Sequence, residues 1–244
     1  MMTQLQNENT AVDNVVRVTG QVLAVGNGAV GKTSIAKMLQ EYKPSVSNYE
    51  NIISKIRRTN NLEFEFLVSE ISQGKTRYSV VSQILVPPGQ KKTEMGKAGR
   101  TFEQVMDLYR FHIKSVDIII LTYNISARNS FIDLKYWLNA VNGYYNPTTN
   151  FLLVGTHLDQ ADEYRKVLPA DIEKGQSQIE QFFKMKMPDW KGSCFAVEIS
   201  NINGKNMEKL EFLISKSILW ARGHLSAKEF MESYNFLFQS NGYY

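Results

Sequence analysis

Residues 26–33 read Gly26-Asn27-Gly28-Ala29-Val30-Gly31-Lys32-Thr33, and this G-x-x-x-x-G-K-T stretch decides the fold. An apolar run, residues 21–25, precedes it, and a helical pattern over residues 34–42 follows it. Glycines let the backbone curl so that several N–H groups point at one anion, and the N-terminus of the following helix adds positive potential. The stretch therefore predicts a phosphate-binding loop rather than a chance glycine-rich turn.

Three side chains at the end of this stretch extend the prediction. Lys32 supplies a point charge for the outer phosphates, and we predict that it also takes part in catalysis. The hydroxyl of Thr33 is a candidate ligand of a magnesium ion, and Ser34 begins the helix beside the phosphates.

The composition limits the class of protein. The chain has 244 residues, of which 43% are hydrophobic and 21% charged, so we expect a packed globular protein. A net charge of +4 is too small to indicate a nucleic-acid partner. Cys194 is the single cysteine, which suits a reducing compartment, and no stretch approaches the roughly 20 apolar residues of a membrane span. We therefore expect a cytoplasmic protein without an integral membrane segment.

Hydrophobic patterning predicts strands that alternate with helices. The expected strands cover residues 15–25, 62–68, 77–86, 116–123, 151–155 and 194–198. The expected helices cover residues 34–42, 101–114, 131–141, 169–186, 207–222 and 225–238. This order is typical of an α/β fold, with a mostly parallel, doubly wound, six-stranded sheet and helices on both faces. The ligand of such a sheet lies at the carboxyl ends of its strands.

The strand at 62–68 alternates apolar and acidic residues, which predicts one solvated face. It is expected to pair antiparallel with the strand at 77–86 across a turn at 73–75.

Three segments divide the chain. We expect a polar N-terminal extension over residues 1–14, the main domain over 15–222 and a helical extension over 223–244. In the last segment an aromatic stripe, Phe230, Tyr234 and Phe238, lies on one helix face. The stripe either packs back on the domain or docks a partner protein.

Gly89 and Gln90 follow the strand at 77–86. A glycine at that place lets a backbone N–H reach the outermost phosphate, and a glutamine beside it can orient an attacking water. The alternative is an ordinary loop turn.

Polar residues also end the two later strands. Asp159 can accept two hydrogen bonds from the N1–H and amino group of guanine, a donor pair that adenine lacks; the alternative is a helix N-cap. Within the same run, Thr156 and His157 complete a T-H-x-D motif, with His157 either exposed or packed along the base. Ser200 and Asn201 form a short loop that can offer a backbone N–H to the guanine carbonyl, or an ordinary strand-to-helix connection.

The order of these motifs resembles a Ras-superfamily small GTPase across residues 15–222, and residues 118–131 are very similar to the matching segment of Ras and Rab proteins. The T-H-x-D motif within residues 151–159 is similar to that of the Roc modules of Roco proteins. The resemblance implies a P-loop G domain that uses GTP or GDP with magnesium. It also implies exchange, activating and effector proteins as partners, and slow intrinsic hydrolysis.

One departure from the family lies at Val86, where the D-x-x-G motif has its aspartate. This loss, with a proline before Gly89, resembles the MglA-type polarity GTPases. The missing carboxylate predicts weak magnesium binding and a changed hydrolysis rate.

The first switch segment is also unusual. Thr59 is the nearest candidate for the threonine that meets the metal and the outermost phosphate, with Ser54 behind it. Arg57 and Arg58 either form a solvated basic loop, the simpler interpretation, or supply a built-in catalytic arginine. The second switch segment, residues 90–100, is long and basic, and it either is solvated or meets an acidic partner.

The sequence therefore favours a nucleotide-controlled switch with GTPase activity. The alternative is a pseudo-GTPase that binds guanine nucleotide with little hydrolysis, which Val86 supports and Gln90 opposes. A third reading, a Roc-like dimerising module, rests on residues 156–159 alone. Peripheral membrane association and nucleotide-dependent dimerisation remain open.

Overall fold

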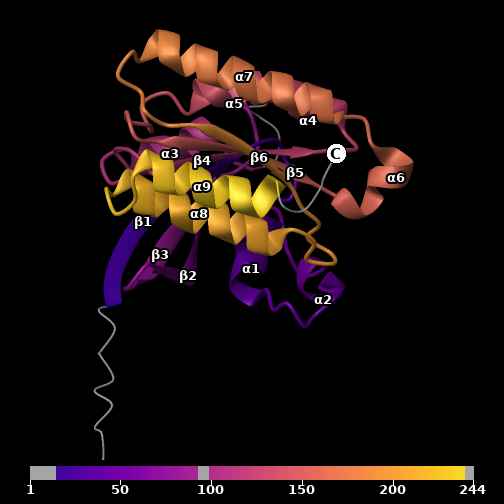
Figure 1. The fold of residues 1–244 in the computed structure, drawn as a ribbon. Helices are drawn as coiled ribbons and strands as arrows, with labels where there is room; N and C mark the ends of the chain where they lie inside the picture. The colour runs from indigo at the N-terminus through magenta and orange to yellow at the C-terminus, as the bar shows by residue number, and fades with distance from the viewer. Residues whose placement is uncertain (1–14, 93–98, 240–244) are drawn as a thin grey trace, which may run out of the picture.

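The computed structural model describes residues 15–92 and 99–239. The described residues form one six-stranded sheet in the order β2-β3-β1-β4-β5-β6, in which β2 and β3 pair antiparallel and the other neighbours pair parallel (Figure 1). The strands are β1 (Val15–Val25), β2 (Glu63–Gln73), β3 (Thr76–Val86), β4 (Ile118–Asn124), β5 (Asn150–Thr156) and β6 (Cys194–Glu198). This architecture confirms the predicted fold class.

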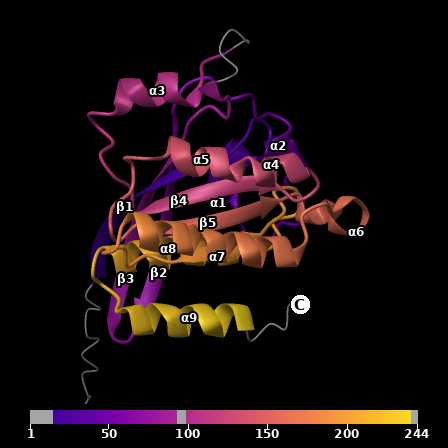
Figure 2. The same ribbon diagram turned by 90° about the horizontal axis from the view of Figure 1, so that it is seen from above.

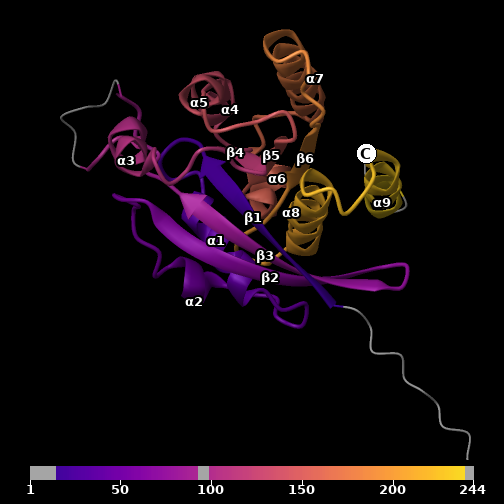
Figure 3. The same cartoon turned by 90° about the vertical axis from the view of Figure 1, so that its left-hand side faces the viewer.

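Helices cover both faces of the sheet (Figure 3). One face packs against α1 (Lys32–Glu41), α8 (Met207–Ala221) and α9 (Ala227–Gln239). The other packs against α3 (Phe102–Tyr109), α5 (Leu134–Ala140) and α7 (Pro169–Lys186). Strand β5 is buried along its whole length and β4 along nearly all of it, as parallel strands between two helical layers must be. Because their carboxyl ends meet at one edge, the polar residues that follow them are brought together.

Helix α9 lies alongside α8 (Figure 2). Its aromatic stripe packs on the domain: the ring of Phe195 in β6 lies 5.1 Å from that of Phe230 and 4.9 Å from that of Tyr234. Phe238 is partly buried against the same core, so the stripe does not form a free docking face. Among the described residues, no helix has both the length and the apolar composition needed to cross a bilayer.

Three predicted elements differ from the observed ones. Helix α3 ends at Tyr109 rather than near residue 114, because the chain turns there and so buries Ile113. The helix expected over 131–141 begins earlier, as α4 (Arg128–Ile132), and is interrupted at Asp133 before α5. A short helix, α2 (Glu50–Ile53), lies between the first predicted helix and the second predicted strand, where no element was expected.

The alternating pattern of β2 predicted one solvated face, and in the structure this is the apolar face rather than the acidic one. Phe64, Phe66 and Val68 are exposed, whereas Glu65 turns toward α1 and accepts a 2.8 Å hydrogen bond from Lys37 Nζ. The solvated face of β2 is thus largely apolar, because α1 offers the acidic side a charged partner.

Three predicted segments lie partly or wholly outside the described residues. They are the N-terminal extension 1–14, the middle of the second switch segment, 93–98, and the end of the tail, 240–244.

Candidate functional site

The glycine loop joins the end of β1 to the start of α1. Gly26 has φ 146°, and a Cβ there would lie 2.3 Å from the backbone oxygen of Thr122, so no larger residue fits. Gly31 has φ 94° and directly precedes α1, and its carbonyl accepts the first helical hydrogen bond, 2.8 Å from Ile35 N. Both glycines are therefore required by the backbone path of the loop.

Lys32 is buried over this loop, with 6% of its surface exposed. Its Nζ donates hydrogen bonds to Gly26 O at 2.9 Å and Asn27 O at 2.8 Å. Burial, and secondly the charge of Arg58, lower the pKa of Lys32 to about 7. No carboxylate pairs with Lys32 in the described part of the chain, so its charge fits an anion brought by a ligand.

Thr33 and Thr59 meet above the start of α1. Their Oγ1 atoms lie 2.6 Å apart, although 26 residues separate them in the chain. Two adjacent oxygens on an octahedral magnesium ion lie about 2.9 Å apart, so the pair fits two ligands of one ion. Ser54 instead donates a hydrogen bond to Asn51 O in α2, so of the two candidates it is Thr59 that lies beside Thr33.

Gly89 lies against the glycine loop. A Cβ on Gly89 would lie 2.4 Å from Lys32 Nζ and 2.5 Å from the Asn27 carbonyl carbon, so only glycine fits at this contact. Gln90 follows it and is buried, with 1% exposure. Arg58 Nη2 donates a 3.1 Å hydrogen bond to Gln90 Oε1, which joins the two switch segments.

A polar network that sequence reasoning missed anchors this region to α5. Asn27 Nδ2 donates to Asp133 Oδ2 at 2.7 Å, and Trp137 Nε1 donates to Asn27 Oδ1 at 2.8 Å. Lys91 Nζ, one residue beyond Gln90, lies 2.6 Å from the same Asp133 oxygen. Burial opposes ionisation of Asp133, yet the hydrogen bonds from Lys91 and Asn27 outweigh it and lower its pKa. The signal in the sequence was Asn27 itself, because a side-chain amide inside a tight loop needs hydrogen-bond partners from elsewhere in the chain.

At the opposite end of the site, Ser200 Oγ donates a 2.6 Å hydrogen bond to Asp159 Oδ1. Thr156 Oγ1 donates to Val30 O at 2.8 Å, which ties β5 to the glycine loop. His157 has φ 66°, and burial, partly offset by the charge of Asp159, lowers its pKa. Asn201 is 7% exposed, and its buried Oδ1 has no partner among the described residues.

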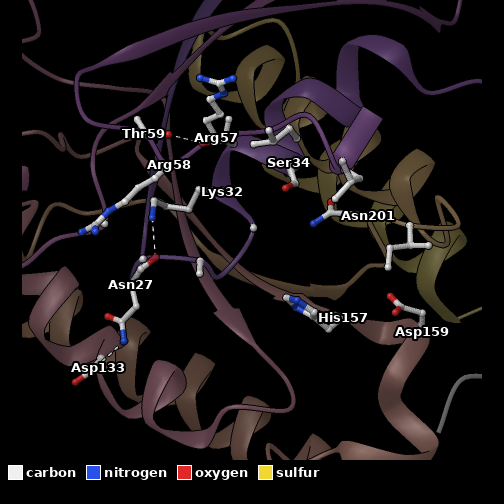
Figure 4. A pocket seen from close by; sticks show the side chains of 18 of the residues that line it. Asn27, Lys32, Ser34, Arg57, Arg58, Thr59, Asp133, His157, Asp159 and Asn201 are labelled. Carbon is white, nitrogen blue, oxygen red and sulfur yellow. Dashed lines mark hydrogen bonds between the residues drawn. The ribbon is translucent and has the colours of Figure 1, made fainter. Parts of the chain in front are cut away.

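A single cavity of about 750 Å³ joins these groups (Figure 4). Lys32, Arg57 and Arg58 lie toward one end, and His157 and Asp159 lie toward the other. Its remaining wall includes these residues: Asn27, Gly28, Ala29, Gly31, Thr33, Ser34, Thr59, Gly89, Lys91, Asp133, Asn201 and Ile202. Of the other predicted site residues, Gly26, Val30, Gln90, Thr156 and Ser200 do not line the cavity. Four of them form hydrogen bonds with residues that do: Gly26 with Lys32, Gln90 with Arg58, Thr156 with His157 and Ser200 with Asp159.

Comparisons with known proteins place the chain in a family. The model of the Ras family matches residues 97–219, which is half of the chain. Ras-related protein Rab-12 of Homo sapiens is 26% identical over 159 residues, covering 65% of this chain and 55% of the relative. Rab-12 of Mus musculus gives the same values, so the chain spans about half the length of the curated relatives it matches. From the family match and the six-stranded fold together, we conclude that this chain belongs to the Ras family.

Proposed function

We propose that the protein is a cytoplasmic switch that binds and hydrolyses GTP. The observation that carries this proposal is the cavity itself. It joins Lys32, a buried lysine without a carboxylate partner among the described residues, to Asp159, a carboxylate held just beyond the end of a parallel strand. An anionic phosphate chain at one end and a guanine base at the other would satisfy both.

The main predicted residues then have these roles in the complex. Lys32 and the backbone N–H groups of residues 28–31 would bind the phosphates. Thr33 and Thr59 would hold a magnesium ion, which neutralises charge on the outer phosphates when bound. Asp159, fixed by Ser200, would accept hydrogen bonds from guanine.

The reaction is the attack of water on the γ-phosphorus of GTP. The water oxygen forms the new P–O bond, and the bond to the bridging oxygen breaks with its electron pair staying on GDP. Both water protons leave on dihydrogen phosphate. Gln90 lies behind the cavity wall in this structure, so its carboxamide would have to turn into the cavity to orient the water, and Gly89 N–H would contact the transferred group.

We propose Arg58, rather than Arg57, as a catalytic arginine supplied by the chain itself. Both line the cavity, but the structure describes a hydrogen bond to Gln90 for Arg58 only. Arg58 also lies close enough to Lys32 for its charge to lower the pKa of that lysine, so both cations face one phosphate end. A guanidinium there would stabilise the charge that develops in the transition state.

Exchange, activating and effector proteins are the proposed partners. The exposed apolar side chains of β2, Phe64, Phe66 and Val68, follow the first switch segment directly. A partner that reads the nucleotide state through Thr59 would meet this strand next.

Two measurements test the proposal against a pseudo-GTPase. The nucleotide that co-purifies with the protein is identified by chromatography, and single-turnover hydrolysis of bound GTP is then followed. We expect guanine nucleotide and measurable turnover. Bound adenine nucleotide would contradict the role of Asp159. Tight GTP binding without turnover would favour the pseudo-GTPase, which Val86 already supports.

A further inference from the structure

Val86, at the place of the usual magnesium-site aspartate, has an acidic neighbour on the next strand. The antiparallel register pairs Glu63 of β2 directly with Val86 of β3. Directly opposed residues point to the same face of a sheet, with Cβ atoms about 5 Å apart. The side chain of Glu63 therefore leaves the sheet on the side on which the missing carboxylate would stand.

The position of Glu63 relative to the start of α1 follows from a contact between β2 and α1. Glu65 contacts Lys37 of α1 through a 2.8 Å hydrogen bond. Moving two residues back along β2, about 6.8 Å, leads to Glu63, and moving four residues back along α1, about 6 Å, leads to Thr33. Both moves run toward the phosphate edge, so Glu63 lies level with Thr33 and its partner Thr59.

The carboxylate of Glu63 is available for a ligand. Its Oε2 is buried and has no hydrogen-bond partner among the described residues. A hydrogen bond to Glu65 raises the pKa of Lys37 against the effect of burial, and the charge of Glu63 adds to that rise. Glu63 thus points toward α1, while Glu65 there is already engaged by Lys37. A buried carboxylate oxygen without a donor fits a water or cation that a ligand brings.

We propose that Glu63 takes over the task of the missing aspartate and orients a water ligand of the magnesium ion held by Thr33 and Thr59. This inference rests on the proposed function, because the ion enters with the nucleotide. Val86 alone predicts weak magnesium binding. With Glu63 on the neighbouring strand as the second carboxylate position, we expect the ion to be held more tightly than that. The side chain of Glu63 is one methylene longer than that of aspartate, which helps its carboxylate to extend from β2 toward the ion.

The test is the magnesium dependence of GDP release, measured with a fluorescent GDP analogue at several free magnesium concentrations. Glu63→Gln keeps the shape and removes the charge. Glu65→Gln, two residues away on the same face, is the matched control. We expect Glu63→Gln to raise the magnesium concentration that half-maximally slows release by about ten- to a hundredfold. Glu65→Gln should change it less than about threefold, and release in chelator should be equal in all three proteins.

A second pair of variants keeps the test decisive. Glu63→Asp shortens the side chain and should give an intermediate shift. Val86→Asp added to Glu63→Gln should restore much of the magnesium response, because it returns a carboxylate to the usual strand. Equal magnesium responses of the natural protein and Glu63→Gln would overturn the inference. Failure of the natural protein to retain any guanine nucleotide would instead overturn the proposed function, and the inference with it.

Discussion

The two ends of the cavity are built differently. At the proposed base end, the buried strand β5 ends at Thr156 and is followed by Asp159, Ser200 follows β6, and a 2.6 Å hydrogen bond joins Asp159 to Ser200. At the proposed phosphate end, Arg58 and Thr59 come from a loop and contact other segments through side chains. The sheet fixes the base end, whereas contacts between loops assemble the phosphate end.

The family match divides along the same line. Residues 97–219 include Asp159 and Ser200, whereas the glycine loop, Thr59 and Val86 all precede them. The matched range thus covers the segments of the proposed base end, whereas Val86, a departure from the family's motif, lies at the proposed phosphate end. A loop-built site tolerates such changes, because a charge lost from one segment can be supplied by another that reaches the same place.

The largest expected effect is at the phosphate end. Arg58→Ala should slow single-turnover GTP hydrolysis about a thousandfold, with little change in GTP affinity, because the arginine acts on transition-state charge. The matched control is Arg57→Ala, which removes the same charge from the same loop and should cost less than about tenfold. The natural protein should also bind GDP with aluminium fluoride without a partner, and Arg58→Ala should not. Equal losses in both variants would remove the special role of Arg58.

At the base end we expect a change in affinity and not in rate. Asp159→Ala should weaken GTP and GDP binding together about a hundredfold, because two guanine donors lose a buried acceptor. Asp162→Ala, an exposed carboxylate on the neighbouring helix α6 (Ala161–Tyr164), is the control. Titration with a fluorescent analogue, with ATP as competitor, measures both. ATP binding as tight as GTP binding would show that Asp159 does not read the base.

A smaller effect is expected in the pH dependence of GDP affinity, which should report on Lys32 at the phosphate end. Burial and the charge of Arg58 lower the pKa of Lys32 to about 7 in the free protein, and phosphates would raise it again. Nucleotide binding therefore takes up a larger fraction of a proton as the pH rises above 7, approaching one proton near pH 8.5, and GDP affinity should fall about eightfold from pH 7.5 to 8.5.

Calorimetry in two buffers of different ionisation enthalpy measures this uptake. Lys32→Arg, which stays charged throughout, should abolish the slope while keeping a cation in place. An unchanged slope in Lys32→Arg would assign the proton to another group.

The smallest expected effect concerns the network around Asp133. Asp133→Asn should slow hydrolysis only a few-fold, because it removes a partly exposed ion pair with Lys91, worth roughly 1 kcal/mol or less. Trp137, which donates to Asn27 in the same network, gives a fluorescence signal for any shift of the loop. A loss as large as that expected for Arg58→Ala would mean that this network positions Gln90 far more strictly than its exposure suggests.

The sequence determined the sheet, the glycine loop and the order of the motifs. Hydrophobic runs such as residues 151–155 are buried on both sides. A continuous apolar run therefore predicts a parallel strand even when the neighbouring strands are not known. The place of Asp159 at the carboxyl edge of the sheet could be predicted for the same reason, because a polar residue just beyond such a strand must lie at that edge. The replacement of the usual aspartate by Val86 could also be recognised from the sequence, because this position stands at a fixed distance before Gly89 and Gln90.

Only the tertiary structure decided which loop residues meet. The choice of Thr59 over Ser54 and of Arg58 over Arg57 depends on how the chain returns across α1. The exposed face of β2 depends on Lys37, because alternation reveals two faces but not which one a helix will cover. The pairing of Glu63 with Val86 requires the register of two strands, and the sequence fixes no register until both strands are packed. Contacts within one element follow from its periodicity, whereas contacts between elements follow from packing that no single segment encodes.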